Sequence, residues 1–164
     1  MTTRRMSVAG MFYPASSDET ESMISHFNRI VDSHPSAKHQ CDTLSARAII
    51  VPHAGWVYSG FTANMAYRIL SRMPITSVVV IGPSHRVGFE GISIAEADDY
   101  ETPLGRCFID RKLVADLRTR FSLPYYPQAH AEHSTEVQIP FIRHYLPNVS
   151  VVELVYAYTS AGEL

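Results

Sequence analysis

The chain has 164 residues, of which 46% are hydrophobic and 18% charged, and its formal net charge is −2. This length and composition are typical of one globular domain with its own core. The near-neutral charge offers no basic surface for nucleic acid or an anionic membrane, and no apolar run is long enough to span a bilayer. We therefore expect a cytoplasmic protein with no nucleic-acid and no membrane partner.

The hydrophobic pattern alternates between helical and strand-like segments along the chain. Apolar residues recur every three or four positions from 23 to 31, which predicts an amphipathic helix, whereas short β-branched runs predict buried strands. In chain order we expect a helix over 18–33, a polar loop over 33–42, a strand over 46–52, a helix over 60–72, a strand over 77–82, a strand over 91–96, a short strand over 106–109, a helix over 110–120, a helix over 133–146 and a strand over 149–156.

The strand over 46–52, the helix over 60–72 and the strand over 77–82 form a βαβ pattern. Such a unit places its two strands parallel, with a right-handed crossover. The sequence therefore predicts an α/β fold in which a central, largely parallel sheet is flanked by helices, and a single domain over residues 1–164.

Two histidines follow the two strands of this unit. His53 comes directly after Pro52, and His85 follows Gly82-Pro-Ser84. Ligands of open α/β sheets bind beyond the carboxyl ends of the strands. Because neighbouring strands deliver both imidazoles to one edge, we expect His53 and His85 to converge as a metal site or an acid–base pair.

A third motif, Glu132-His-Ser-Thr-Glu136, begins the helix expected over 133–146. His133 and Glu136 are three residues apart and would share one helix face, where they can serve as a ligand, a general base or an orienting group. The motif is equally consistent with a capped helix start. The other five histidines lie in polar or amphipathic surroundings and are expected at the surface: His26, His34, His39, His130 and His144.

Several ordered motifs together resemble the Memo family. They are Ala9–Pro14, Pro52–Gly60, Ile81–His85, Tyr100–Gly105 and Glu132–Gln138. Memo proteins are similar in fold to class III extradiol dioxygenases, which hold non-haem Fe(II) with two His and one Glu and open catechol rings with O₂. The resemblance implies that His53 and His85 are metal ligands, and that His133 and Glu136 line the pocket behind the metal or act as acid and base.

The same resemblance implies a divalent transition metal, with iron first and copper or zinc as alternatives. The third ligand of the family is commonly a Cys from a later half of the sequence, which has no counterpart here; Cys41 and Cys107 lie outside the matching motif. The run Ser160-Ala-Gly-Glu163 also fits a helix capping box at the very end of the chain. We therefore expect an incomplete C-terminal part and weak or absent ring-cleaving activity as a metal-dependent oxidoreductase.

A binding module is the alternative function. The same cleft would then recognise a small molecule, a peptide or a small anion through Trp56, Tyr58 and the following helix N-terminus. A third interpretation is a fragment that needs another chain to complete its sheet, and a homo-oligomer is compatible with each of these functions.

Overall fold

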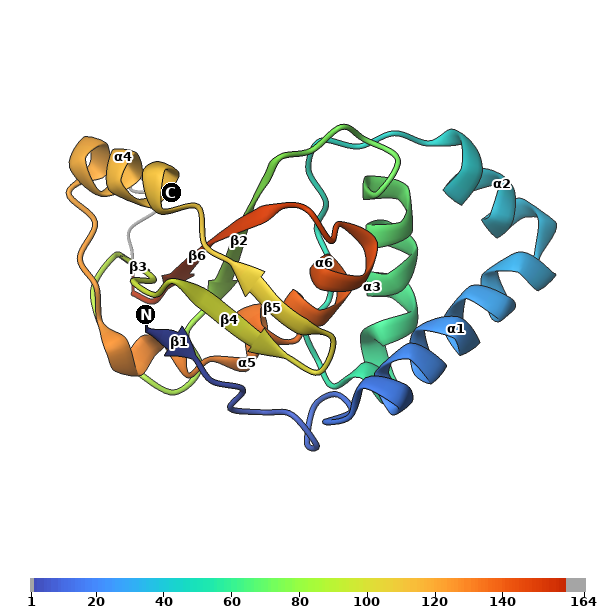
Figure 1. Ribbon diagram of the computed structural model, residues 1–164, viewed down its shortest axis with the longest axis horizontal. Coiled ribbons are helices and arrows are strands. Elements are labelled where there is room, and N and C mark those ends of the chain that lie inside the picture. Colours follow the sequence, from blue (N-terminus) through green and yellow to red (C-terminus); the bar gives the residue numbers. More distant parts are fainter. Residues whose placement is uncertain (1, 159–164) are drawn as a thin grey trace.

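The computed structural model describes residues 2–158 and shows a mixed α/β protein. Its strands are β1 (Thr3–Arg4), β2 (Ser77–Pro83), β3 (Ile92–Ile94), β4 (Asp99–Thr102), β5 (Gly105–Phe108) and β6 (Ser150–Tyr156). Its helices are α1 (Ser17–Ser33), α2 (Pro35–Thr43), α3 (Trp56–Leu70), α4 (Arg111–Phe121), α5 (His133–Glu136) and α6 (Ile139–Tyr145), with a 3₁₀ turn, η1, at Pro127–His130. Figure 1 shows α1, α2 and α3 together at one end of the molecule, and the strands with α4 at the other.

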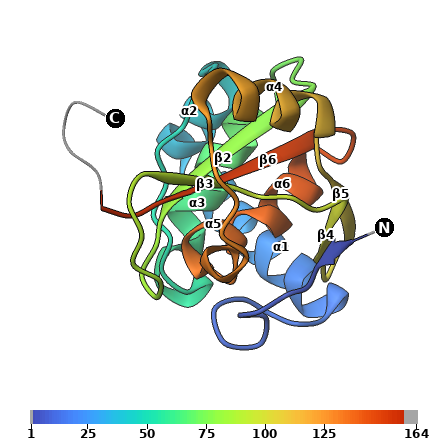
Figure 2. The ribbon, with the colours of Figure 1, turned by 90° about the vertical axis from the view of Figure 1, so that its left-hand side faces the viewer.

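The strands form two separate three-stranded sheets instead of the single central sheet expected from the sequence. In one sheet β6 lies between β2, to which it is parallel, and β3, to which it is antiparallel. In the other, β4 pairs in parallel with β1 and antiparallel with β5. Figure 2 shows β2 and β6 side by side across the middle of the molecule. Parallel pairing therefore joins only two strands in each sheet.

The strand expected over 46–52 is not formed. The segment belongs to no ladder, although its side chains still alternate as in a strand: Ile49 and Val51 are partly buried, whereas Ile50 is fully exposed. A groove of about 830 Å³ is lined both by this segment and by β2. The apolar alternation that predicts a strand is present, but the backbone of residues 46–52 does not pair with the edge of β2.

The other sequence-based elements are found with shifted ends. The segment expected as a polar loop over 33–42 is mostly the helix α2, which Pro35 begins at a position where the missing N–H costs nothing. The helix expected over 133–146 is divided into α5 and α6, with Val137 and Gln138 between them. The expected capping box at Ser160-Ala-Gly-Glu163 lies outside the described residues.

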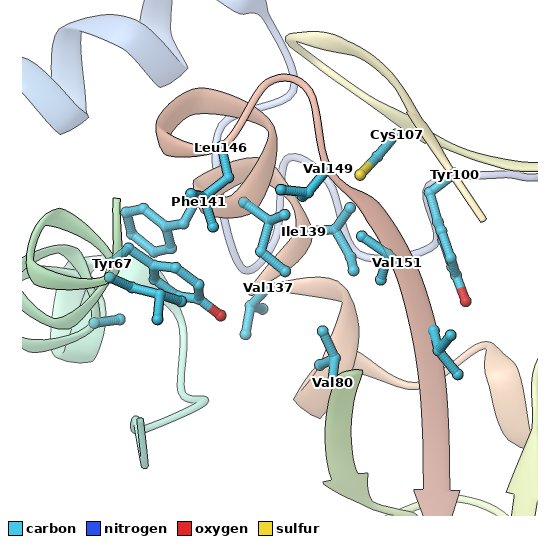
Figure 3. Close-up of a cluster of buried hydrophobic side chains, with 14 of the residues drawn as sticks. Tyr67, Val80, Tyr100, Cys107, Val137, Ile139, Phe141, Leu146, Val149 and Val151 are labelled. Atoms are coloured by element: carbon cyan, nitrogen blue, oxygen red, sulfur yellow. The ribbon is translucent and has the colours of Figure 1, made fainter. Parts of the chain in front are cut away.

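The core joins the helical end of the molecule to the two sheets. Trp56 stacks on Phe141 of α6 at 3.9 Å between ring centroids, and its indole Nε1 donates a hydrogen bond to the Val137 carbonyl at 2.9 Å. Phe141 also stacks on Tyr67, and Figure 3 shows both rings in one cluster with Ile139 and Val151. The start of α3, just after His53, is thus held firmly against the segment that follows His133.

A buried polar network lies between the two sheets. The Glu153 carboxylate, on β6, accepts hydrogen bonds from Tyr100 at 2.6 Å and from Thr135, and lies 2.8 Å from Nδ1 of His130. His130 is only 4% exposed, so its expected surface position is wrong. Its buried position follows from Glu153, because a buried carboxylate requires polar partners.

Candidate metal centre

Three histidine side chains meet at one place in the structure. His53 and His85 lie 5.2 Å apart between ring centroids, which confirms the convergence expected from the sequence. His133 joins them, at 4.5 Å from His85 and 6.0 Å from His53. One ring nitrogen of each residue can be chosen so that all three lie within 4.8 Å of one another. These nitrogens are therefore close enough to share one metal ion.

Each histidine is positioned by a different element. His53 lies between the extended segment 46–52 and the start of α3, His85 follows the end of β2, and His133 is the first residue of α5. The turn after β2 is fixed because the Ser84 N–H donates to the Tyr156 carbonyl at 2.7 Å. The Ser84 hydroxyl also donates to the Val87 carbonyl at 2.7 Å. The cluster therefore joins residues 80 positions apart in the sequence.

Gly82 allows α5 to approach β2 closely. A Cβ atom at this position would lie 2.6 Å from Oγ of Ser134 and 2.8 Å from Cγ2 of Thr135, both of which belong to α5. Ser134 also donates a hydrogen bond to the Pro83 carbonyl at 2.8 Å. The absence of a side chain at residue 82 is thus what brings His133 next to His85.

Glu132 lies directly behind two of the three imidazoles. Its Oε1 accepts a hydrogen bond from Nδ1 of His85 at 3.0 Å and lies 2.8 Å from Nδ1 of His133, which makes no hydrogen bond of normal geometry. Its Oε2 accepts from the backbone N–H of His85 at 2.7 Å. The sequence motif includes Glu132, but its role was missed because only the structure shows which carboxylate of the motif faces the histidines.

The electrostatics of the cluster favour the neutral form of His53 and of His133, because the pKa of each is lowered. Burial lowers the pKa of His53, and the neighbouring His85 lowers it further. Burial also lowers the pKa of His133, despite the opposing charge of Glu132. Burial would raise the pKa of Glu132, but hydrogen bonds from His85 hold it below its ordinary value. Neutral imidazoles are the form that binds metal ions.

Glu136 does not join the three histidines. Its carboxylate accepts hydrogen bonds from the backbone N–H of Ser7 and Val8, both at 2.9 Å, and from the hydroxyl of Tyr13 at 2.9 Å. It also pairs with Arg4 at 2.8 Å. These contacts hold the carboxylate on the N-terminal segment, and the acid–base role expected for Glu136 stays a prediction.

Three imidazole nitrogens are a suitable ligand set for a divalent transition metal. Imidazole binds zinc, copper, iron and nickel, and a site with three protein ligands leaves positions for water or substrate. Cys41 and Cys107 are buried free thiols outside this group. Burial raises the pKa of the Cys107 thiol to about 11, so it stays protonated at neutral pH and is a poor metal ligand.

Two hollows adjoin the histidine cluster. The groove of about 830 Å³ includes His53 and has mainly aliphatic walls from residues 48–51 and 78–81. A smaller cavity of about 270 Å³ includes His85, Arg86 and Tyr156. Trp56, expected as a ligand contact of a binding module, is only 2% exposed and belongs to the core, whereas Tyr58 is exposed. The walls of the groove beside the cluster thus come mainly from β2 and from the segment before His53.

The family model described as Memo-like protein matches residues 4–163, and the chain therefore belongs to this family. A MEMO1 family protein of Thermoplasma volcanium is 37% identical over 147 residues, which cover 88% of this chain and 52% of that relative. A MEMO1 family protein of Aquifex aeolicus is 35% identical over 153 residues, covering 88% and 51%. The protein memo-1 homolog of Caenorhabditis elegans is 40% identical over 100 residues, covering 60% and 29%.

The chain spans about half the length of the first two relatives. The family resemblance read from the ordered motifs is confirmed by these matches, which run through nearly all of the described residues. Within the part of the chain that the structure describes, no helix has both the length and the apolar character needed to cross a membrane.

Proposed function

We propose that this protein binds a divalent transition metal through His53, His85 and His133. The observation that carries the proposal is the convergence of three ring nitrogens within 4.8 Å of one another. Sequence reasoning gives His133 an acid–base role, but its distance from the other two rings favours direct ligation. As a metal ligand, His133 would still line the pocket, as the motif leads us to expect.

The reaction class that we propose is dioxygenase-like oxidation of a small aromatic molecule, with iron as the first candidate metal and copper as an alternative. Zinc, the other candidate ion for the site, has no redox chemistry and would be held there without supporting this oxidation. A bound Fe(II) would supply open coordination positions for O₂ and substrate. The chain itself supplies neutral imidazole donors and an adjoining groove with aliphatic walls. We expect weak or absent ring cleavage, because the three side chains that converge are all imidazoles, whereas non-haem Fe(II) oxygenases use two His and one carboxylate. The cytoplasmic location and the homo-oligomer stay predictions.

Metal titration of the purified chain tests this proposal. We expect Co²⁺, Zn²⁺ and Cu²⁺ to bind at one ion per chain, and each of His53→Ala, His85→Ala and His133→Ala to weaken binding by more than about 10-fold, since each removes a ligand. Isothermal titration calorimetry and elemental analysis measure affinity and stoichiometry.

The exposed His39 of α2 provides the matched control. His39→Ala should bind metal as the unaltered chain does. Metal binding that survives all three substitutions in the cluster would exclude this site. If the chain binds no metal but does bind a peptide or inorganic phosphate, the binding-module alternative is favoured instead, and Tyr58→Ala should then reduce that binding.

A further inference from the structure

We infer that Glu132 is a positioning residue that orients His85 and His133 toward the metal ion, an inference that rests on the proposed function. A single oxygen, Oε1, lies 3.0 Å from Nδ1 of His85 and 2.8 Å from Nδ1 of His133. One buried carboxylate oxygen thus contacts Nδ1 of two of the three proposed ligands.

The hydrogen bond to His85 determines which of its nitrogens is free. An ionised carboxylate can only accept hydrogen bonds, so Nδ1 of His85 must carry the proton. The remaining nitrogen, Nε2, then has a lone pair available for a metal. Metal-bound histidines in proteins are commonly held by a carboxylate in this way, and the carboxylate also increases the basicity of the ligand.

Glu132 is itself held rigidly. It is 1% exposed, and its oxygens accept hydrogen bonds from the backbone N–H of His85 at 2.7 Å and of Ser134 at 3.2 Å. These contacts tie the carboxylate to the turn after β2 and to the start of α5 at the same time. A carboxylate fixed by two backbone segments can fix the two rings with less loss of entropy when the metal binds.

His53 has no equivalent support in residues 2–158, where no side-chain hydrogen bond to its ring is found. The three proposed ligands therefore differ: His85 is hydrogen-bonded to Glu132, His133 lies against the same carboxylate oxygen, and His53 is positioned by the backbone between segment 46–52 and α3. Loss of the Glu132 charge should consequently disturb the geometry at His85 and His133 while leaving His53 in place.

The test is Glu132→Gln, which keeps the size of the side chain and removes its charge. We expect a loss of Co²⁺ affinity of about 10- to 100-fold, the range typical of such supporting groups. The visible absorption spectrum of bound Co²⁺ should also change, because it reports ligand geometry. A purely structural role of Glu132 would lower thermal stability without changing the spectrum of the metal bound to the folded protein.

Glu153→Gln is the matched control. Glu153 is likewise fully buried and lies beside a histidine, His130, but it contacts none of the three proposed ligands. We expect this variant to be less stable and to keep both the affinity and the spectrum for Co²⁺ in its folded fraction. An equal loss of affinity in both variants would show that Glu132 acts only through general stability and would overturn the inference.

A second measurement does not depend on whether a variant folds. Two-bond ¹H–¹⁵N NMR correlations of the metal-free wild-type chain identify the protonated ring nitrogen, and we expect the Nδ1–H form for His85. The Nε2–H form at His85, or an unchanged Co²⁺ spectrum and affinity in Glu132→Gln, would refute the positioning role. If the wild-type chain binds no Co²⁺ at all, the proposed function fails, whereas the tautomer result still reports on Glu132.

Discussion

The contacts of Glu136 are those of a residue that stabilises the fold. The side chains of Glu136 and Arg4 are 3% and 11% exposed, and the carboxylate has hydrogen bonds from the N-terminal segment as well. Burial would raise its pKa, but Arg4 and the hydrogen bonds from Ser7 and Val8 hold the pKa below its ordinary value. Glu136 is therefore a charged carboxylate at neutral pH with each oxygen in use.

Removing this carboxylate should destabilise the protein strongly. We expect Glu136→Ala to lower the free energy of unfolding by about 3 kcal/mol, because it leaves the buried Arg4 charge with a more distant partner and several donors without an acceptor. Urea unfolding followed by circular dichroism measures the change. Glu101→Ala, which removes the half-buried partner of the exposed Arg5, should cost less than about 1 kcal/mol. Equal effects of the two substitutions would contradict this assignment.

At the residue scale, the sequence identifies the converging histidines better than it identifies the residues that contact them. The convergence of His53 and His85 was predictable because each follows an apolar strand-like run, although residues 46–52 form no ladder with β2. Glu132 and His130 were not predictable in their roles, because the atoms that they contact come from segments 47 and 23 residues away in sequence. Glu132 comes directly before His133, and a carboxylate next to a candidate ligand is the signal that could have indicated the role of Glu132.

At the element scale, the packing of α5 on β2 determines how closely His133 approaches His85 in the proposed metal centre. Gly82→Ala would add a Cβ atom at 2.6 Å from Oγ of Ser134 and 2.8 Å from Cγ2 of Thr135, so the start of α5 must shift relative to β2. We expect a loss of stability of about 1–3 kcal/mol from this overpacking. We also expect Co²⁺ binding to weaken by more than about 10-fold, because the shift moves His133 away from His85.

Gly60→Ala gives a matched comparison for the packing effect. Its added Cβ would lie 2.9 Å from the ring of Phe27, at the contact between α3 and α1. This substitution should lower the melting temperature as well, but the folded fraction should bind Co²⁺ normally. If Gly82→Ala and Gly60→Ala had the same metal affinity, the α5–β2 approach would not control the site.

Element boundaries differ from the sequence expectation where local pattern and tertiary pairing disagree. Residues 46–52 have the alternation of a strand, yet strand formation depends on a pairing partner and cannot be read from periodicity alone. Residues 133–146 have a helical pattern, but Pro140 lacks an N–H and fits only the first turn of a helix, so α6 begins anew at Ile139. The long, regular helix α1 was predictable: it begins at Ser17, one residue before the expected start, and ends at Ser33 as expected.

At the scale of the whole molecule, the buried network of Arg4, Glu136 and Glu153 connects the two sheets. Arg4 is in β1, Glu153 is in β6, and Tyr100 of β4 donates to Glu153. The N-terminal strand and the C-terminal strand of the described chain are thereby held together by charge. A buried charge network therefore connects two sheets where the sequence predicts one continuous central sheet. The pairing of charges so far apart in the chain leaves no pattern in the local sequence.

The network should make the fold sensitive to acid. Burial would raise the pKa of Glu153, but Arg4 and hydrogen bonds from His130 and Thr135 lower it from the ordinary value of 4.5 to about 2. A carboxylate with a depressed pKa in the folded state stabilises the protein fully above its unfolded-state pKa, and this contribution is lost as pH falls toward the folded-state value. For Glu153 the loss should therefore run from about pH 4.5 to about pH 2 and amount to roughly 3 kcal/mol.

Urea unfolding of the metal-free chain between pH 7 and pH 2, with a chelator present, measures this dependence. Glu136 and Glu132 also have lowered pKa values, so they add to the loss in the same direction. Glu153→Gln should be less stable at pH 7 and should lose less stability on acidification, because residue 153 no longer titrates. A wild-type free energy of unfolding that stays constant from pH 7 to pH 3, or equal pH dependence in both proteins, would show that the network is not charged in the way the geometry indicates.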